Sequence, residues 1–127
     1  MLSDNPAMAN IAVSDLGTAK KFYEDVLGLT VLREDPSGRT MYKTGDTAIF
    51  IYQSEFAGTN KADYLAWEVG NDFKQIVAEL HAKDVMFDDY SDMFGIEIVD
   101  GVHIMGDMGL VWIQDPDGNL IIIAGKL

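Results

Sequence analysis

The chain passes twice through the same predicted order of elements: a strand, a helix and three further strands. The first pass covers about residues 8–53 and the second about 63–125, and a small, polar connector over 54–62 separates them. Strands are indicated by alternating apolar residues, and helices by apolar residues at helical spacing. An internal repeat of this kind restricts the fold to two similar α+β modules, each with a helix over the apolar face of its strands.

Turn-forming and capping residues fix the boundaries within each module. In the first, Asp15 suits the N-cap of a helix over 16–27, and Gly28 can end it in a left-handed conformation. In the second, Asn71 or Asp72 caps the helix. The predicted strands lie at 9–14, 29–34, 39–44 and 47–53 in the first module, and at 64–69, 85–87, 101–105, 109–114 and 119–124 in the second.

The last two predicted strands are joined by Asp115-Pro116-Asp117-Gly118. Pro116 fixes φ at the second position of a tight turn, and Gly118 can adopt a positive φ. Two apolar strands joined in this way form a hairpin.

Charge and composition exclude several classes of function. The formal net charge is −12, which disfavours nucleic acids and anionic membranes as partners because both carry negative charge. The chain has no cysteine, which excludes disulfides, thiolate nucleophiles and thiolate metal sites. Its longest apolar run is too short to span a bilayer, so we expect a cytoplasmic protein.

Three sequence blocks are specific when taken together: Val-Ser-Asp-Leu at 13–16, Phe-Tyr-Glu-Asp-Val-Leu-Gly-Leu at 22–29, and Asp-Pro-Asp-Gly-Asn at 115–119. With them the chain resembles the vicinal oxygen chelate (VOC) superfamily, which includes glyoxalase I, extradiol dioxygenases and bleomycin-resistance proteins. The resemblance implies a single domain over 1–127, built from two βαβββ modules whose sheets form open cups with helices outside. It also implies a homodimer.

Metal-dependent members of that superfamily bind a divalent ion through His, Glu or Gln side chains from the first and last strand of each module. Counting from the motifs places Met8, Phe50, Tyr64 and Ile122 at these positions. None is a histidine or a carboxylate, the usual ligands of a catalytic divalent ion. The sequence therefore predicts no catalytic residue, no bound metal and no other cofactor.

Alternation along the strands places small, aromatic and polar side chains inside the cup. A binding pocket needs such a wall, mostly apolar with a few polar groups. Tyrosine rings can stack on a ligand or hold a cation, and Glu68 would supply a counter-charge. The pattern leaves open which way Tyr42, His103 and Trp112 face. The predicted ligand-binding residues are Asn10, Phe50, Tyr52, Tyr64, Glu68, His103, Trp112 and Ile122.

The function predicted first is metal-independent sequestration of an apolar or aromatic small molecule, cationic ones included. The alternative is a metal-dependent lyase, isomerase or dioxygenase of the same superfamily, with a non-standard site formed by His103, Glu68 and a carboxylate of the 88–100 segment. A third hypothesis is a module that packs against another protein, whose side chain would fill the cup.

Overall fold

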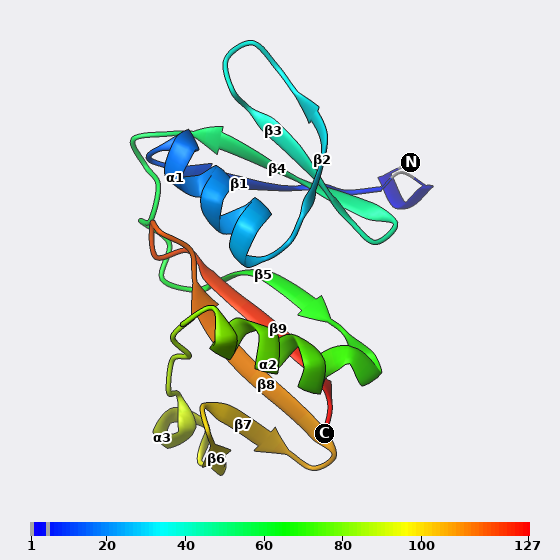
Figure 1. Ribbon diagram of the computed structural model, residues 1–127, viewed down its shortest axis with the longest axis vertical. Coiled ribbons are helices and arrows are strands. Elements are labelled where there is room, and N and C mark those ends of the chain that lie inside the picture. Colours follow the sequence, from blue (N-terminus) through cyan, green and yellow to red (C-terminus); the bar gives the residue numbers. More distant parts are fainter. Residues whose placement is uncertain (1, 5) are drawn as a thin grey trace. The chain divides into compact units, whose positions relative to one another are not determined.

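The computed structural model describes residues 2–4 and 6–127 and contains two compact units, each with its own sheet (Figure 1). The first unit comprises the residues up to Asn60 together with Pro116–Gly118. The second comprises Lys61–Asp115 and Asn119–Leu127. Both sheets are open, so the α+β fold class predicted from the sequence is confirmed. Within the described residues, no helix is long and apolar enough to cross a membrane.

The sheet of the first unit has the strand order β1-β4-β3-β2. Strand β1 runs parallel to β4, and the other pairs are antiparallel. A short helical turn, η1 (Leu2–Asp4), precedes this sheet. Its strands are β1 (Ala9–Val13), β2 (Thr30–Glu34), β3 (Thr40–Thr44) and β4 (Thr47–Gln53).

One helix connects β1 to β2. It begins as α1 (Leu16–Lys20) and widens into a π-helical stretch, η2 (Lys21–Val26). The Asp15 carboxylate accepts the Thr18 amide N–H at 2.7 Å, which satisfies one of the amide groups left unpaired at a helix start. Gly28 ends the helix at φ +70°, as the sequence predicted.

The sheet of the second unit has the order β5-β9-β8-β7-β6, so its four longer strands repeat the arrangement of the first unit. A turn of 3₁₀ helix, η3 (Gly70–Asp72), leads into the main helix α2 (Phe73–Ala82), and Asp72 lies at its N-cap. A short helix, α3 (Ser91–Phe94), follows. The strands are β5 (Asp63–Glu68), β6 (Ile98–Val99), β7 (Val102–Met105), β8 (Met108–Gln114) and β9 (Leu120–Lys126).

The strand predicted at 85–87 is wrong. The chain turns sharply after α2, with Asp84 at φ +57°, and the Val85 amide bonds back to the Leu80 carbonyl at 3.0 Å. Phe87 packs on the His81 ring instead of joining the sheet. Only Asp88 makes an isolated bridge, to Trp112 of β8. Val85 and Phe87 are half-buried beside the end of α2 and Met86 is exposed. A short apolar run alone therefore does not distinguish such a segment from a strand.

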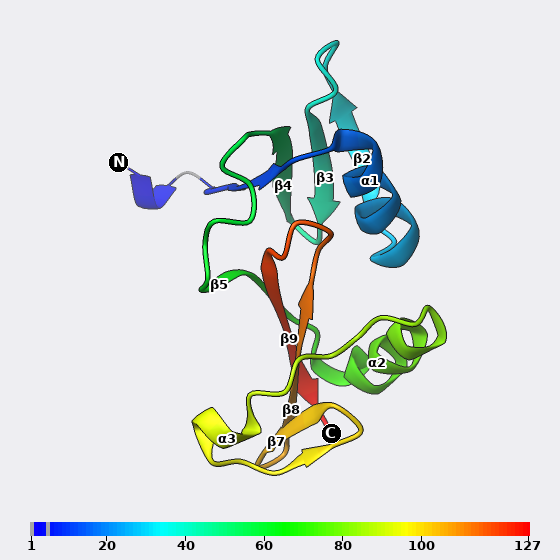
Figure 2. The same ribbon diagram turned by 90° about the vertical axis from the view of Figure 1, so that its left-hand side faces the viewer.

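Each sheet is covered by a helix on one face (Figure 2). In the first unit, most residues of β1, β3 and β4 that face the helix are buried, and Tyr42 is among them, stacked on Tyr23 with ring centroids 6.1 Å apart. Burial, together with a hydrogen bond to Glu24, raises the pKa of the Tyr42 phenol. In the first unit the buried strand residues on this face are Ile11, Val13, Thr40, Tyr42, Ile49 and Ile51.

At two glycines of the second sheet, helix α2 comes unusually close to the strands. Gly109 of β8 and Gly125 of β9 lie opposite each other, and the Phe73 side chain packs over both. A Cβ atom added at Gly125 would lie 2.6 Å from the Phe73 Cβ and 2.7 Å from the Gly70 carbonyl oxygen. Both contacts are well inside van der Waals distance, so the helix approaches this closely only because the side chains are missing.

We predict that Gly125→Ala lowers the free energy of unfolding by about 1–3 kcal/mol, the usual cost of overpacking a well-filled site. Urea or thermal unfolding followed by circular dichroism measures the effect. Gly17→Ala is the matched control, because its Cβ would meet no atom closer than 3.4 Å. Equal effects of the two substitutions would contradict the packing argument.

Candidate functional site: a hollow on the open face of the first sheet

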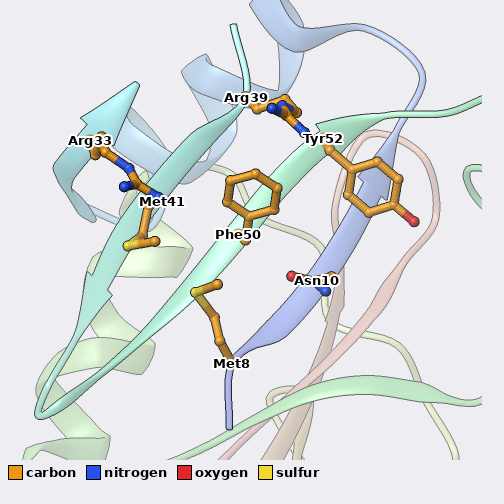
Figure 3. A pocket seen from close by; sticks show the side chains of 7 residues that line it. All are labelled: Met8, Asn10, Arg33, Arg39, Met41, Phe50 and Tyr52. Atoms are coloured by element: carbon orange, nitrogen blue, oxygen red, sulfur yellow. The ribbon is translucent and has the colours of Figure 1, made fainter. Parts of the chain in front are cut away.

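The first unit has a hollow of about 390 Å³ on the face of its sheet that the helix leaves uncovered. Figure 3 shows Phe50 near the middle of the lining side chains, with Met8 and Asn10 beside it. An adjoining hollow of about 300 Å³ is lined by Arg33, Asp35, Arg39 and Phe50 and shares three of these residues with the first. The lining residues of the larger hollow are Met8, Asn10, Arg33, Arg39, Met41, Phe50 and Tyr52.

Strands β1 and β4 supply one wall of this hollow. Their parallel register pairs Asn10 with Phe50 and Ala12 with Tyr52. Side chains two residues apart share a face of a sheet, so Phe50 and Tyr52 lie next to each other on β4. Three residues of the predicted ligand-binding set, Asn10, Phe50 and Tyr52, are thereby brought together with Met8.

A β-bulge in strand β2 places Arg33 at the hollow. Val31 pairs with Tyr42 and Arg33 with Met41, so the intervening Leu32 is an extra residue on β2. The bulge puts Arg33 on the same face as Met41 and Phe50, whereas Glu34 faces the helix and pairs with Lys20 at 2.5 Å. Bulges occur preferentially on edge strands such as β2 and change the direction of side chains in this way.

Arg39 reaches the hollow from the turn between β2 and β3. Its Nε donates to the Asp35 carboxylate at 2.6 Å, and its guanidinium carbon lies 5.8 Å from the centre of the Phe50 ring. Asp35 also accepts hydrogen bonds from the hydroxyl of Ser37 at 2.5 Å and from its amide at 2.9 Å. These bonds, that of the Ser37 hydroxyl first, lower the pKa of Asp35 from 3.8 to about 2.

In the second unit, His103 and Trp112 lie on the face away from α2, but both are buried. The imidazole Nε2 of His103 accepts the Tyr90 amide N–H at 2.9 Å, so the ring proton is on Nδ1. Nδ1 has no hydrogen-bond partner among the described residues. The Trp112 ring packs against His103 at 4.7 Å between centroids and donates its N–H to Asp63. Neither ring is among the side chains that line the two hollows of the first unit.

The remaining predicted ligand-binding residues lie on β5 and β9 of the second unit. Ile122 of β9 pairs with Ala66, which is two residues from both Tyr64 and Glu68 on β5. Tyr64 and Ile122 are half-buried, and Glu68 is exposed. Strand β5 shifts its register to β9 between Asp63 and Leu65, so Tyr64 lies at a β-bulge.

The side chains at the four positions that were counted from the sequence motifs do not fit a divalent ion. Met8, Phe50 and Ile122 offer a thioether, a phenyl ring and an alkyl group, and Tyr64 offers a neutral phenol. Zn²⁺, Fe²⁺ and Mn²⁺ prefer imidazole and carboxylate ligands. Of the residues that the structure describes, no three His, Cys, Asp or Glu lie close enough together to hold a metal ion. His103, Glu68 and a carboxylate of residues 88–100 therefore do not form such a group here.

Sequence reasoning missed Arg33, Arg39 and Met41. Regular alternation counted from Val31 would place Arg33 on the helix side, and nothing in Val31-Leu32-Arg33 reveals that Leu32 is an extra residue. Arg39 follows the Pro36-Ser37-Gly38 turn, where alternation gives no direction. One signal was available: the sequence contains two arginines, six residues apart, on either side of that turn.

Known proteins with similar sequences identify the family of this chain. A family model described as "Glyoxalase/Bleomycin resistance protein/Dioxygenase superfamily" matches residues 6–123. Virulence protein STM3117 of Salmonella typhimurium is 27% identical over an alignment 125 residues long, which covers 90% of this chain and 78% of that protein. Its crystal structure superposes over 100% of both chains with a TM-score of 0.68 at 24% identity.

Two further solved structures share the fold. TnmS3, an antibiotic binding protein from Streptomyces, has a TM-score of 0.72 at 21% identity and covers 97% of this chain and 96% of its own. Lactoylglutathione lyase from Agrobacterium tumefaciens has a TM-score of 0.70 at 15% identity, with 95% and 92% covered. At these identities the likeness shows the fold alone.

We predict that Ser37→Ala raises the pKa of Asp35 from about 2 towards 3.8, because the Ser37 hydroxyl is the main group that stabilises the carboxylate. The stabilising effect of ionised Asp35 is complete above pH 3.8 and is lost as the pH falls through 2. Carboxyl-carbon NMR titration measures the change. Ser91→Ala is the control, since Ser91 makes the equivalent bonds to Asp89 in the second unit; an unchanged Asp35 pKa in Ser37→Ala would contradict the assignment.

Proposed function

The chain belongs to the glyoxalase/bleomycin resistance protein/dioxygenase superfamily, and from this premise we propose that it is a metal-independent small-molecule binding protein. The proposed site is the hollow of the first unit, and the proposed ligand is aromatic or apolar. One observation carries the proposal: the hollow combines two aromatic rings and two methionine side chains with three polar side chains, those of Asn10, Arg33 and Arg39. Such a wall is typical of ligand pockets, whose few polar groups fix orientation.

The size and chemistry of the hollow suit a small planar ligand. Its volume of about 390 Å³ is near the lower end of the range of roughly 300–1,000 Å³ found for ligand pockets. Phe50 and Tyr52 are half-buried, which leaves part of each ring available for contact. Offset or edge-on contacts between aromatic rings contribute about 0.5–1.5 kcal/mol beyond area burial. Met8 and Met41 can adjust to the outline of a bound ring.

The fold by itself does not separate binding from catalysis, because it occurs both in an antibiotic binding protein and in a lactoylglutathione lyase. The donor chemistry favours binding. A catalytic metal in this superfamily polarises a substrate oxygen, and it needs nitrogen or carboxylate ligands to be held. The four positions in this chain carry Met8, Phe50, Tyr64 and Ile122, and three of these side chains have no nitrogen or oxygen atom.

Two further proposals follow from the family resemblance and from composition. We propose a homodimer, the commonest symmetric assembly. We also propose a cytoplasmic location, in keeping with the absence of cysteine from the sequence.

We predict that Phe50→Ala weakens binding of any aromatic ligand found by thermal-shift screening by at least about tenfold, or roughly 1.4 kcal/mol, because it removes the central ring of the hollow. Isothermal titration calorimetry of the purified variants measures this change. Phe56→Ala is the matched control, since Phe56 is 70% exposed and lies in the connector between the modules. Equal losses in the two variants would place the ligand elsewhere.

We further predict that ligand affinity is unchanged by EDTA and that Zn²⁺, Ni²⁺ or Mn²⁺ do not bind at a stoichiometry of one per chain. Calorimetric titration of the protein with each ion, beside elemental analysis, measures both quantities. Stoichiometric uptake that is lost in Glu68→Gln would support the enzyme alternative instead. Glu68 is exposed, so this substitution leaves the packing of the second unit intact.

A further inference from the structure

We propose that the ligand of this hollow is an aromatic anion, with its acidic group bound by the Arg33 guanidinium and its ring held against Phe50 and Tyr52. This inference rests on the proposed function and specifies its ligand class. It replaces the expectation from sequence that cationic ligands are included. Of the residues assigned a ligand role from the sequence, Glu68 alone is acidic, and it does not line the hollow.

The distribution of basic residues carries the argument. The chain has nine basic residues, of which two are arginines, and both arginines line this hollow. The larger hollow has no acidic residue among its lining side chains, although the chain as a whole carries a formal net charge of −12. The planar guanidinium differs from the lysine ammonium because it offers two parallel N–H groups to a carboxylate or phosphate. The choice of arginine at both positions therefore fits an acidic ligand group.

The two arginines have different local partners. Arg39 is bound through Nε to Asp35, so the carboxylate offsets much of its charge and fixes its position. For the Arg33 side chain, the structure records no ion pair or hydrogen bond within residues 2–4 and 6–127, and the bulge at Leu32 directs this residue to the hollow. Across both hollows the charges of Arg33, Arg39 and Asp35 sum to +1. Arg33 is thus the group available to pair with an anion.

The aromatic part of the ligand follows from the surroundings of Phe50. The Arg39 guanidinium lies 5.8 Å from the centre of this ring, which places a positive charge beside the π system. A cationic ligand in this hollow would be repelled by the net positive charge that Arg33 supplies, whereas an anionic ligand would be attracted. Figure 3 shows Arg33 and Arg39 on the side of the hollow opposite Met8 and Asn10, with Met41 beside Arg33.

Three matched probes test the charge preference: 2-naphthoate, the neutral 2-naphthamide and the cationic 2-naphthylmethylammonium, each titrated calorimetrically into the full chain. We expect 2-naphthoate to bind at least tenfold more tightly than the amide, and the ammonium to bind most weakly. The advantage of the acid should shrink as salt is added, because exposed charges are screened. Phenyl phosphate and benzoate, compared in the same way, distinguish phosphate from carboxylate as the acidic group.

Variants of the arginine complete the test. Arg33→Gln should reduce the affinity for 2-naphthoate to that for the amide, and Arg33→Lys should restore only part of it because the ammonium has no planar pair of donors. Lys74→Gln, which removes one positive charge from α2 in the second unit, should leave the affinity unchanged. Thermal unfolding of all three variants checks folding, which we expect to be intact because Arg33 is exposed.

The two levels of the proposal fail differently. If the amide or the ammonium binds as tightly as 2-naphthoate, and Phe50→Ala weakens all three, the anion inference is overturned while the proposed binding function stands. If 2-naphthoate is preferred but Arg33→Gln has no more effect than Lys74→Gln, the assignment of Arg33 is overturned. If none of the probes binds, the proposed function is contradicted and the anion inference fails with it.

Discussion

The one-sided covering of each sheet by a helix is the constraint on which the other features depend. Side chains alternate along a strand, so the helix buries every second residue and leaves the remainder on an open face. Ile11, Ile49 and Ile51 are buried because α1 covers them, and Asn10, Phe50 and Tyr52 share the opposite face because they are their neighbours. A shift of one residue in any strand would exchange these two sets. The contents of the hollow are therefore fixed by strand register.

Most of the fold could be predicted because its local signals are strong. Asp15, Gly28 and the Asp115–Asn119 turn each determine the conformation of only a few neighbouring residues. In the structure, Asp15 begins the first helix, Gly28 ends it, and the turn joins the last two strands. The strand predicted at Val85–Phe87 was wrong because a run of three apolar residues also occurs where the chain turns after a helix, with only Val85 and Phe87 half-buried. Half of the hollow was predictable, since Asn10, Phe50 and Tyr52 follow regular alternation. Arg33 was not, because the bulge that places it has no signature in side-chain type.

Local and overall charge act at different ranges in this protein. The net charge of −12 is spread over the surface and is screened beyond about 8 Å at physiological salt. Within the hollow, the nearest groups decide the potential, and these include two guanidinium groups and one carboxylate that is already paired. An acidic protein can thus present a positive site without contradiction. Composition describes how the whole molecule behaves in solution, and it carries little information about one site.

The residues of the hollow come from two separable parts of the chain. Strand β4 provides the two aromatic rings, and β1, which pairs with it in parallel, provides Asn10. The β2–β3 hairpin at the sheet edge provides Arg33, Arg39 and Met41. Edge hairpins accept sequence change more readily than central strands, because fewer backbone bonds and packed side chains depend on them. Changes in this one hairpin could therefore alter the charge of the ligand that a related chain binds. The scaffold and its preference for an aromatic ring would stay the same.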